Sequence, residues 1–358
     1  MSRKIFAVIA VGLLASACTG PAGEDGLDGE IGPIGPIGPI GPDGRSTWLT
    51  GPGIQLEVTA ASITAGVATV DFTITDDAGV PLDLDGLYSE GAVTPSFILA
   101  WLDEDPVDGV GQYTAYTTRA QTSPITNVTE IQAATDSGGT IAEVGVGLGT
   151  YTYTFATSVT VADATKTHTV GATARRTFDG ERYVANTTFD FLPNGSAVTT
   201  TRNVVTMAAC NDCHGRLEFH GGSRRDVKLC ILCHQPQSVD PDTGNTVDLK
   251  VMAHKIHRGD LLPSVLAGTP YQIIGYQQSV HDYSTVAFPR EIDICETCHV
   301  GANASLWMNR PGRAACGSCH DGTSFVDPPP ANTVLHSGGA QADDSNCTTC
   351  HPATGGVA

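Results

Sequence analysis

The sequence predicts a multidomain chain in which an all-β region precedes a region with little regular secondary structure. In the first region, from about Trp48 to Arg202, apolar and polar residues alternate over short stretches rich in threonine, valine and tyrosine. Turn signals such as DSGG and PNG separate these stretches. In the second region the alternation stops, and one cysteine–histidine string recurs five times. We expect the boundary between residues 203 and 204.

Four stretches define the strands expected in the first region. The alternation is clear at residues 68–75, 151–155 and 168–174, whereas the run FILAWL at 97–102 is continuously apolar, as in a strand buried on both faces. A region of about 150 residues is large enough to bury a core of its own. The sequence therefore predicts a β-sandwich or small barrel at residues 47–203, and we find no catalytic set of residues in it.

Ten of the eleven cysteines belong to five copies of the string C-x-x-C-H, numbered here motif 1 to motif 5 in chain order. This string attaches c-type haem, because its two thiols reach the two vinyl groups of one porphyrin and the next histidine ligates the iron. The five motifs predict five covalently bound haems in a pentahaem domain at residues 204–358. The motif residues are Cys210, Cys213 and His214; Cys230, Cys233 and His234; Cys295, Cys298 and His299; Cys316, Cys319 and His320; and Cys347, Cys350 and His351.

Zinc and disulfides are the alternative explanations of these cysteines. A zinc ribbon uses two C-x-x-C pairs for one ion, so five pairs leave one unmatched, and zinc gives no reason for a histidine after every second cysteine. A disulfide framework does not need that histidine either. The sequence therefore favours haem.

Histidines outside the motifs match the predicted irons in number. After Cys210 the chain has ten histidines, and five of them lie outside the motifs. We interpret these as distal ligands, which makes every haem bis-histidine and leaves no open iron for catalysis. Methionines at positions 207, 252 and 308 are the rival ligands. The five distal candidates are His220, His254, His257, His281 and His336.

Local sequence supports these candidates unequally. Glycines follow His220 and His336, and they let the backbone pass close to a flat porphyrin. His254 and His257 are three residues apart, so on a helix they share a face and would lie between two neighbouring haems. His281 has the least local support. His168 lies on the apolar face of its expected strand. It is either a buried structural histidine, which we favour, or a haem ligand in place of His281.

The composition of residues 210–358 indicates how the haems would be packed. The stretch is rich in Gly, Pro, Asp, Ser and Thr and has little periodic apolar sequence, so the polypeptide alone would have too small a core. We therefore expect the haems themselves to form the core, with short helices near the motifs and loops between. Haems packed so closely would have near-touching edges and would form a conducting row.

The N-terminus resembles the signal of an exported lipoprotein. Arg3 and Lys4 precede an apolar run that ends at Leu14 and is too short to span a membrane. Small residues then lead to Cys18, the one cysteine outside the motifs. We predict a signal peptide at residues 1–17 and lipidation of Cys18, which would anchor the protein in the outer membrane, at the cell surface or on the periplasmic face. The alternative is ordinary cleavage with an incidental cysteine.

Residues 18–46 contain a collagen-like repeat in which glycine occupies every third position from Gly20 to Gly44. The repeat could form a short triple helix, on which a surface filament or adhesin could be built, or an extended polyproline-II tether. We favour the tether, because few glycine triplets without hydroxyproline make a weak triple helix.

The order of these parts resembles a known family, the outer-membrane decahaem c-type cytochromes of the OmcA/MtrC type. The matching strings include CNDCHGRLEFHGG, HKIHRGDLLP, VAFPREIDICETCH and LHSGG. The resemblance implies a split Greek-key β-barrel and haems that relay electrons to minerals, metal ions, flavins or partner cytochromes. It also implies that His220, His254, His257 and His336 are distal ligands. Family members usually contain two β-plus-pentahaem units, whereas this chain contains one, so a relay or a homo-oligomeric assembly is as plausible as a terminal reductase.

The formal net charge of −19 limits the partners. It argues against nucleic acid and anionic surfaces, and it suits cationic or mineral-bound metal acceptors. Arg224, Arg225 and Lys228 form a small basic cluster that either offsets haem propionates or is simply solvated.

These observations favour an electron-transfer protein that acts with other multihaem cytochromes or an outer-membrane porin–cytochrome conduit. Whether it is also a terminal metal reductase stays open. The alternative function is a multihaem reductase of a small oxyanion, which requires one haem with an open coordination position.

Overall fold

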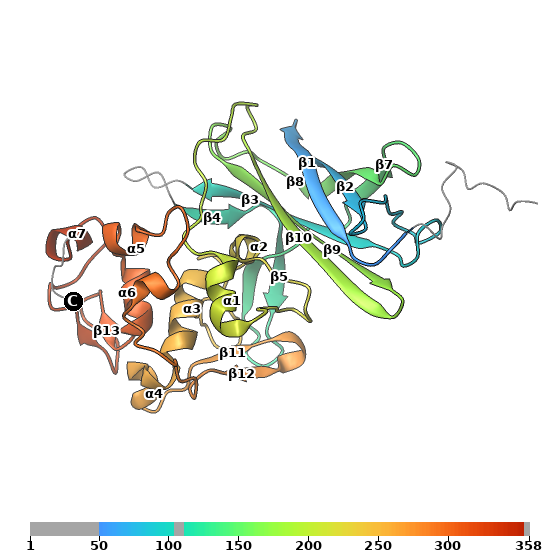
Figure 1. Ribbon diagram of the computed structural model, residues 1–358. Coiled ribbons are helices and arrows are strands. Elements are labelled where there is room, and N and C mark those ends of the chain that lie inside the picture. The colour runs from blue at the N-terminus through green and yellow to red at the C-terminus, as the bar shows by residue number, and fades with distance from the viewer. Residues whose placement is uncertain (1–49, 104–110, 354–358) are drawn as a thin grey trace, which may run out of the picture. The chain divides into compact units, whose positions relative to one another are not determined.

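The structure is a computed structural model of the chain, and it describes residues 50–103 and 111–353 (Figure 1). The predicted signal peptide, Cys18 and the collagen-like repeat lie outside the described residues. No helix in the described part is long and apolar enough to cross a membrane.

Two four-stranded antiparallel sheets form the first region, which confirms the all-β prediction. One sheet has the order β1-β2-β8-β7 and the other has the order β10-β9-β3-β4. Strands β5 and β6 pair only with each other and form a separate hairpin. The strands are β1 (Gln55–Thr64), β2 (Val67–Thr75), β3 (Thr94–Asp103), β4 (Gln112–Ala115), β5 (Thr118–Thr122), β6 (Thr129–Ala133), β7 (Thr140–Glu143), β8 (Thr150–Ser158), β9 (His168–Phe178) and β10 (Glu181–Phe191).

The main core lies between the two sheets. Alternate residues of β2, β8 and β9 point into it, in the register that the sequence pattern predicted. Phe97 of β3 stacks on Tyr153 of β8, with ring centroids 4.3 Å apart, and lies 5.0 Å from Phe72 of β2. These aromatic contacts join strands of opposite sheets, so the sheets pack face to face.

Strands β3 and β9 are also covered on their second face, which explains the continuous apolar run in β3. Ile98, Ala100 and Leu102 of β3 form a second apolar cluster with Leu229 and Leu232, which lie on helix α2 (Val227–Cys233). Helix α2 carries the cysteines of motif 2. The second region is therefore packed directly on the sheet.

Gly171 of β9 makes this close packing possible. A Cβ atom at this position would lie 2.5 Å from Leu229 Cδ1 and 2.6 Å from Leu232 Cδ1, closer than packed carbon atoms approach. Only glycine therefore fits between the sheet and α2 without a shift of the helix.

The second region has short helices and long connections, as predicted. Helices α2 and α3 begin at capping carboxylates, because the Asp226 and Asp248 side chains accept hydrogen bonds from the backbone N–H groups of Lys228 and Lys250. Its other elements are α1 (Met207–His214), α3 (Leu249–Arg258), η2 (Gly259–Leu261), α4 (Pro263–Leu266), β11 (Gln272–Ile274), η3 (Tyr276–Gln278), β12 (Val280–Asp282), η4 (Cys295–Thr297), α5 (Leu306–Asn309), α6 (Arg313–Cys319), β13 (Thr323–Ser324), β14 (Val334–Leu335) and α7 (Cys347–Cys350).

Few apolar side chains of the second region are buried. Among its described residues they are Ala209, Val227, Leu229, Leu232, Leu262 and Tyr271. So small a set would not stabilise a domain of this length, in agreement with the expectation that the polypeptide forms little core of its own.

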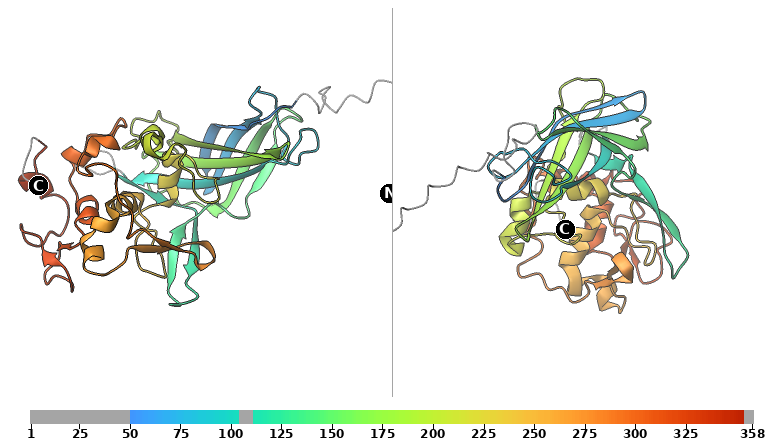
Figure 2. Two further views of the ribbon diagram at one scale, coloured as in Figure 1. Left: turned by 60° about the horizontal axis from the view of Figure 1, so that its bottom comes forward. Right: turned by 90° about the vertical axis from the view of Figure 1, so that its right-hand side faces the viewer.

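The β5–β6 hairpin forms a second contact between the two regions. It leaves the sheets and runs beside the chain that follows motif 2 (Figures 1 and 2). The Gln132 side chain donates to the Val239 carbonyl over 2.9 Å, and the Ser123 hydroxyl donates to the Asp242 carboxylate over 2.5 Å. Motif 2 is therefore held from two sides by the β region.

We predict that Gly171→Ala destabilises the haem-loaded protein by about 1–3 kcal/mol, because the added methyl group forces α2 away from the sheet. Urea unfolding followed by far-ultraviolet circular dichroism measures this. Gly51→Ala is the matched control, since a Cβ there meets only the Asp76 carboxylate at 3.6 Å. Equal midpoints for the two variants would contradict the packing role of Gly171.

Candidate functional site

The five motifs share one local geometry. Each lies on or directly after one turn of helix, in α1, α2, η4, α6 and α7. In motifs 2 to 5 the histidine N–H donates to the carbonyl of the first cysteine over 2.8–3.0 Å, which closes the last helical turn. Because residues three apart lie on one face of a helix, both thiols face the same side and the histidine follows at the helix end. This arrangement suits two thioether bonds and one iron ligand from the same segment.

The two alternative explanations of the cysteines find no support among the described residues. The ten motif cysteines are unbridged, and no group of three or more His, Cys, Asp or Glu side chains is arranged to hold a metal ion in residues 50–103 and 111–353. The C-x-x-C pairs thus do not converge in twos, as a zinc ribbon would require.

Four motif histidines each face one of the predicted distal histidines. The two histidines of each pair come from separate positions in the sequence. The distance between their two ring centroids is nearly the same in all four pairs. The pairs are His214 with His257 at 6.0 Å, His220 with His234 at 5.9 Å, His254 with His299 at 6.2 Å, and His336 with His351 at 6.2 Å.

This separation fits an iron atom between the rings. A metal bonds an imidazole nitrogen at about 2 Å, and each ring centroid lies about 1 Å behind that nitrogen, so two rings on one iron have centroids about 6 Å apart. Ordinary aromatic pairs also have centroids about 4.5–7 Å apart, so what marks these four is that each joins a motif histidine to a histidine outside the motifs. The four pairs therefore fit bis-histidine haem ligation, and no methionine takes part in them.

Hydrogen bonds at Nδ1 orient several of these rings. In α3 the Nδ1 atoms of His254 and His257 lie 2.6 Å from the Lys250 carbonyl and 2.8 Å from the Ala253 carbonyl. The Nδ1 atom of His234 lies 3.0 Å from the Val247 carbonyl. A carbonyl can only accept, so Nδ1 carries the proton and Nε2 keeps its lone pair for a metal.

Helix α3 joins three motifs. The prediction that His254 and His257 lie on one helix is confirmed, and the two rings face motif 3 and motif 1. Lys255, between them, forms a 2.6 Å ion pair with Asp321, which follows the histidine of motif 4. Burial raises the pKa of Asp321, but hydrogen bonds from Lys255 and Ser264 outweigh burial and keep that pKa below its usual value.

His220 reaches its partner through an unusual turn. His220, Gly221 and Gly222 all have positive φ, at 52°, 66° and 76°. A side chain at Gly221 would meet no atom within 4 Å, so the space beside this turn is open. Gly221, predicted to let a porphyrin pass, thus borders open space, whereas a Cβ at Gly222 would lie 3.4 Å from Glu218 Oε1.

Motif 4 and His281 form no such pair. His281 is exposed on β12, and its Nε2 lies 3.1 Å from the Ser279 hydroxyl. Within the described part of the chain no ring contact joins His281 to His320 or to another motif histidine. The structure therefore brings together four of the five expected pairs.

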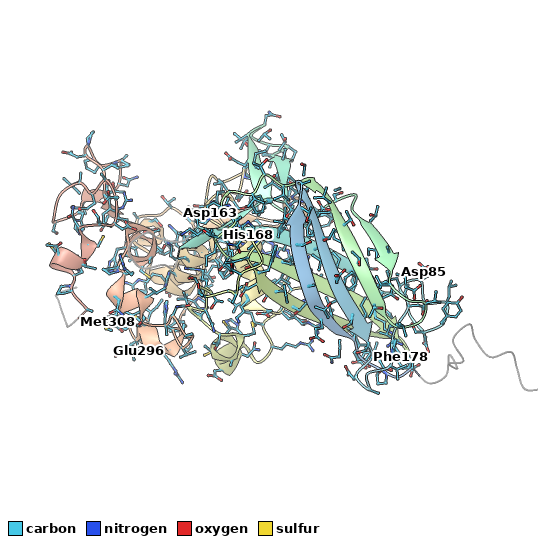
Figure 3. All side chains as sticks on the ribbon, turned by 90° about the horizontal axis from the view of Figure 1, so that it is seen from above. Asp85, Asp163, His168, Phe178, Glu296 and Met308 are labelled. Atoms are coloured by element: carbon cyan, nitrogen blue, oxygen red, sulfur yellow. The ribbon has the colours of Figure 1, made fainter. Side chains whose placement is uncertain are left out.

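His168 belongs to the β region, as Figure 3 shows. Its side chain is fully buried, Nε2 lies 2.8 Å from the Tyr116 hydroxyl, and Nδ1 lies 2.9 Å from the Lys166 carbonyl. Burial lowers the pKa of His168 and favours the neutral ring. Because both nitrogens are engaged, the structure favours the structural reading of His168 over a ligand that replaces His281.

Interactions between thiols give the neighbour relations of the motifs. Burial raises the pKa of the Cys230 thiol to about 12, with a smaller contribution from Cys210 of motif 1. Burial likewise raises the pKa of Cys210, and Cys298 of motif 3 adds to the shift. The pKa values of Cys295 and Cys347 are raised by burial and, to a smaller extent, by Cys316 of motif 4. Thiols of motif 2 are therefore close to motif 1, those of motif 1 to motif 3, and those of motif 4 to motifs 3 and 5.

Comparisons with known proteins show which cytochromes the chain is similar to. Residues 202–357 match the family model described as outer membrane cytochrome MtrC/MtrF-like, domains II/IV. The chain is 28% identical over 174 residues to the multiheme cytochrome MtrC of Shewanella baltica (strain OS185), a match that covers 47% of this chain and 21% of that protein.

Two solved structures resemble this fold. The outer membrane decaheme cytochrome OmcA has a TM-score of 0.60 and 29% identity, with 75% of this chain and 43% of that chain covered. MtrC from Shewanella baltica OS185 has a TM-score of 0.54 and 23% identity, with 84% and 43% covered, and this likeness concerns the fold alone. The chain spans less than half the length of these relatives.

We predict that His257→Ala creates one haem that binds carbon monoxide, because the substitution removes the ring that faces His214 and leaves the His254–His299 pair in place. The carbon monoxide difference spectrum of the reduced protein measures this. Met308→Leu serves as the comparison, since no methionine takes part in the four histidine pairs. An unchanged spectrum for His257→Ala would contradict the pairing.

Proposed function

Because the chain belongs to the outer-membrane cytochrome family of the OmcA/MtrC type, we propose that it carries five covalently bound c-type haems and transfers electrons along them at or outside the outer membrane. The four facing histidine pairs with centroids 5.9–6.2 Å apart are the observation that carries this proposal. Their spacing fits irons with two imidazole ligands, which exchange electrons without binding a substrate.

The proposed ligands follow from the geometry. The ten motif cysteines attach the haems, and the motif histidines are the proximal ligands. His257, His220, His254 and His336 are the distal ligands for motifs 1, 2, 3 and 5. For motif 4 the proposed distal ligand is His281, which would have to approach His320 when the haem is attached.

The protein's own contribution is to hold and orient these rings. Hydrogen bonds from Nδ1 to backbone carbonyls fix the His254, His257 and His234 rings, so that each imidazole needs little rearrangement when the iron changes charge. The haems supply the reversible one-electron chemistry. Haems held by motifs 2 and 1, 1 and 3, 3 and 4, and 4 and 5 would lie next to one another, because the thiols of these motifs interact.

The N-terminal predictions complete the proposal. A signal peptide at residues 1–17, lipidation of Cys18 and a tether at residues 18–46 would hold a β-domain (47–203) and a pentahaem domain (204–358) at the outer membrane. The partners would be other multihaem cytochromes or a porin–cytochrome conduit, with metal ions or minerals as acceptors. A single unit of this kind suits a relay, or one member of a homo-oligomeric row of haems.

A second candidate function is supported by motif 4. Its histidine faces no other histidine among the described residues, so its haem is the one most open to an outside ligand. Such a haem could reduce a small oxyanion, which needs a free coordination position. The two functions differ in whether the iron of motif 4 is closed or open.

We predict that the mature protein carries five haems by intact mass, and that its electron paramagnetic resonance spectrum contains only low-spin bis-histidine signals. One high-spin signal beside the low-spin signals would instead favour the oxyanion reductase. Fewer than five haems would contradict the proposal as a whole.

A further inference from the structure

The β5–β6 hairpin has one edge that no other described strand covers. Its two strands pair only with each other. The β6 edge lies against the chain that follows motif 2, because the Ala133 N–H group donates to the Ser238 hydroxyl over 3.1 Å. The β5 edge is on the opposite side of the hairpin, which projects from the sheets in Figure 2. An uncovered edge of this kind is a template for pairing with another strand.

Backbone groups along the β5 edge are unpaired. In an antiparallel pair, hydrogen-bonded residues alternate with residues whose N–H and C=O groups point outward. The Ser123 N–H group donates to the Val128 carbonyl over 2.9 Å, so the odd-numbered residues of β5 are the bonded ones. Within residues 50–103 and 111–353, no hydrogen bond reaches the outward backbone groups of the even-numbered residues, and these residues are exposed. The even-numbered residues are Thr118, Ala120 and Thr122.

The sequence of β5 is nearly the same when read in either direction. It is Thr-Arg-Ala-Gln-Thr, with Ala120 at its centre. Antiparallel pairing with the same strand of a second copy, centred on Ala120, would place Thr118 of one copy opposite Thr122 of the other. It would also place Arg119 opposite Gln121. The outward N–H and C=O groups of the two copies then meet, and no like charges face each other.

Both faces of such a sheet are complementary as well. Ile131 lies opposite Ala120 in the hairpin, and 55% of it is exposed. In the paired sheet the isoleucines of both copies would flank the two alanines and form one apolar row across four strands. On the other face, Arg119 of one copy and Glu130 of the other would lie in the same row, on either side of Gln121. Opposite charges in one row attract, so both faces favour this register.

We propose that β5 is a homodimer interface, at which two copies of this chain pair antiparallel about Ala120 and their hairpins form one four-stranded sheet. A two-stranded hairpin is only marginally stable by itself, and added strands stabilise it. The interface is isologous, because the same strand contributes on both sides. The inference goes beyond the proposed function and does not depend on it, since only backbone groups and side chains of the hairpins take part. A five-residue ladder buries less surface than a permanent dimer does, so association depends on protein concentration.

A cysteine at the two-fold axis tests the register. In the full, haem-loaded chain, Ala120→Cys places two thiols opposite each other, with about 5.5 Å between the Cα atoms. Ile141→Cys is the matched control, because Ile141 is also exposed and lies on β7, an edge strand of its sheet. The unsubstituted chain controls for the native cysteines. Whole cells are treated with a short bismaleimide, and the purified products are identified by intact mass.

We expect a product of twice the chain's mass from Ala120→Cys, and none from Ile141→Cys or the unsubstituted chain. An equal yield from Ile141→Cys, or no product from Ala120→Cys, would overturn the inference. A product that joins Ala120→Cys to a different protein would overturn it too, because the edge would then bind another partner.

Charge at position 121 provides an independent test. Gln121→Arg places two arginines opposite each other on both sides of the axis, and should raise the dimer dissociation constant about tenfold at low salt. The hairpin itself should not suffer, because residue 121 lies opposite Glu130 within it. Arg119→Glu added to the same chain pairs opposite charges across the axis and should restore the native constant.

Sedimentation velocity of the haem-loaded chains over a range of concentrations measures these constants. The inference fails if the unsubstituted chain stays monomeric throughout, or if Gln121→Arg leaves the constant unchanged. It fails equally if the double variant associates no better than Gln121→Arg, because a loss caused by misfolding would not be reversed by the second substitution.

Discussion

The separation between facing imidazole rings is the constraint on which the haem-motif region depends. Four pairs, drawn from loops, short helices and one positive-φ turn, hold their centroids within 0.3 Å of one another, at 5.9–6.2 Å. Apolar packing does not produce this agreement, because few apolar side chains of the region are buried. Two imidazoles on one iron, as proposed above, would hold their centroids at this separation, since metal–nitrogen bonds have a fixed length. On this proposal the haems would supply most of the core of the region.

The β region gives this arrangement a rigid base. Motif 2 begins on α2, which packs on the sheet through Leu229 and Leu232 over Gly171, and the β5–β6 hairpin holds the segment that follows. Helix α3 connects further motifs, because His257 faces motif 1 and His254 faces motif 3. Its Lys255 also forms an ion pair with Asp321, which follows motif 4. Ligand positions far from the sheet are fixed through this short series of contacts.

Charge is distributed unevenly over the protein. A net charge of −19 keeps the molecule away from polyanions. Around motif 2, however, Arg182 of β10 and Arg225 of the loop between motifs 1 and 2 donate to the carbonyls of Gly221 and Gly222, next to His220. These arginines come together only in the folded chain, so a count along the sequence detects just the Arg224–Lys228 cluster.

The sequence by itself determined the all-β region, the apolar strand at 97–102, the five motifs and the candidate ligands, because strand periodicity and C-x-x-C-H spacing are local properties. It also placed His254 and His257 on one helix. Only the tertiary structure decided which histidine faces which motif, that His168 is buried with both nitrogens engaged, and that His281 stands apart from His320. These features depend on contacts between residues that lie far apart in the sequence, such as Tyr116 with His168 and His254 with His299. No local sequence pattern encodes such contacts.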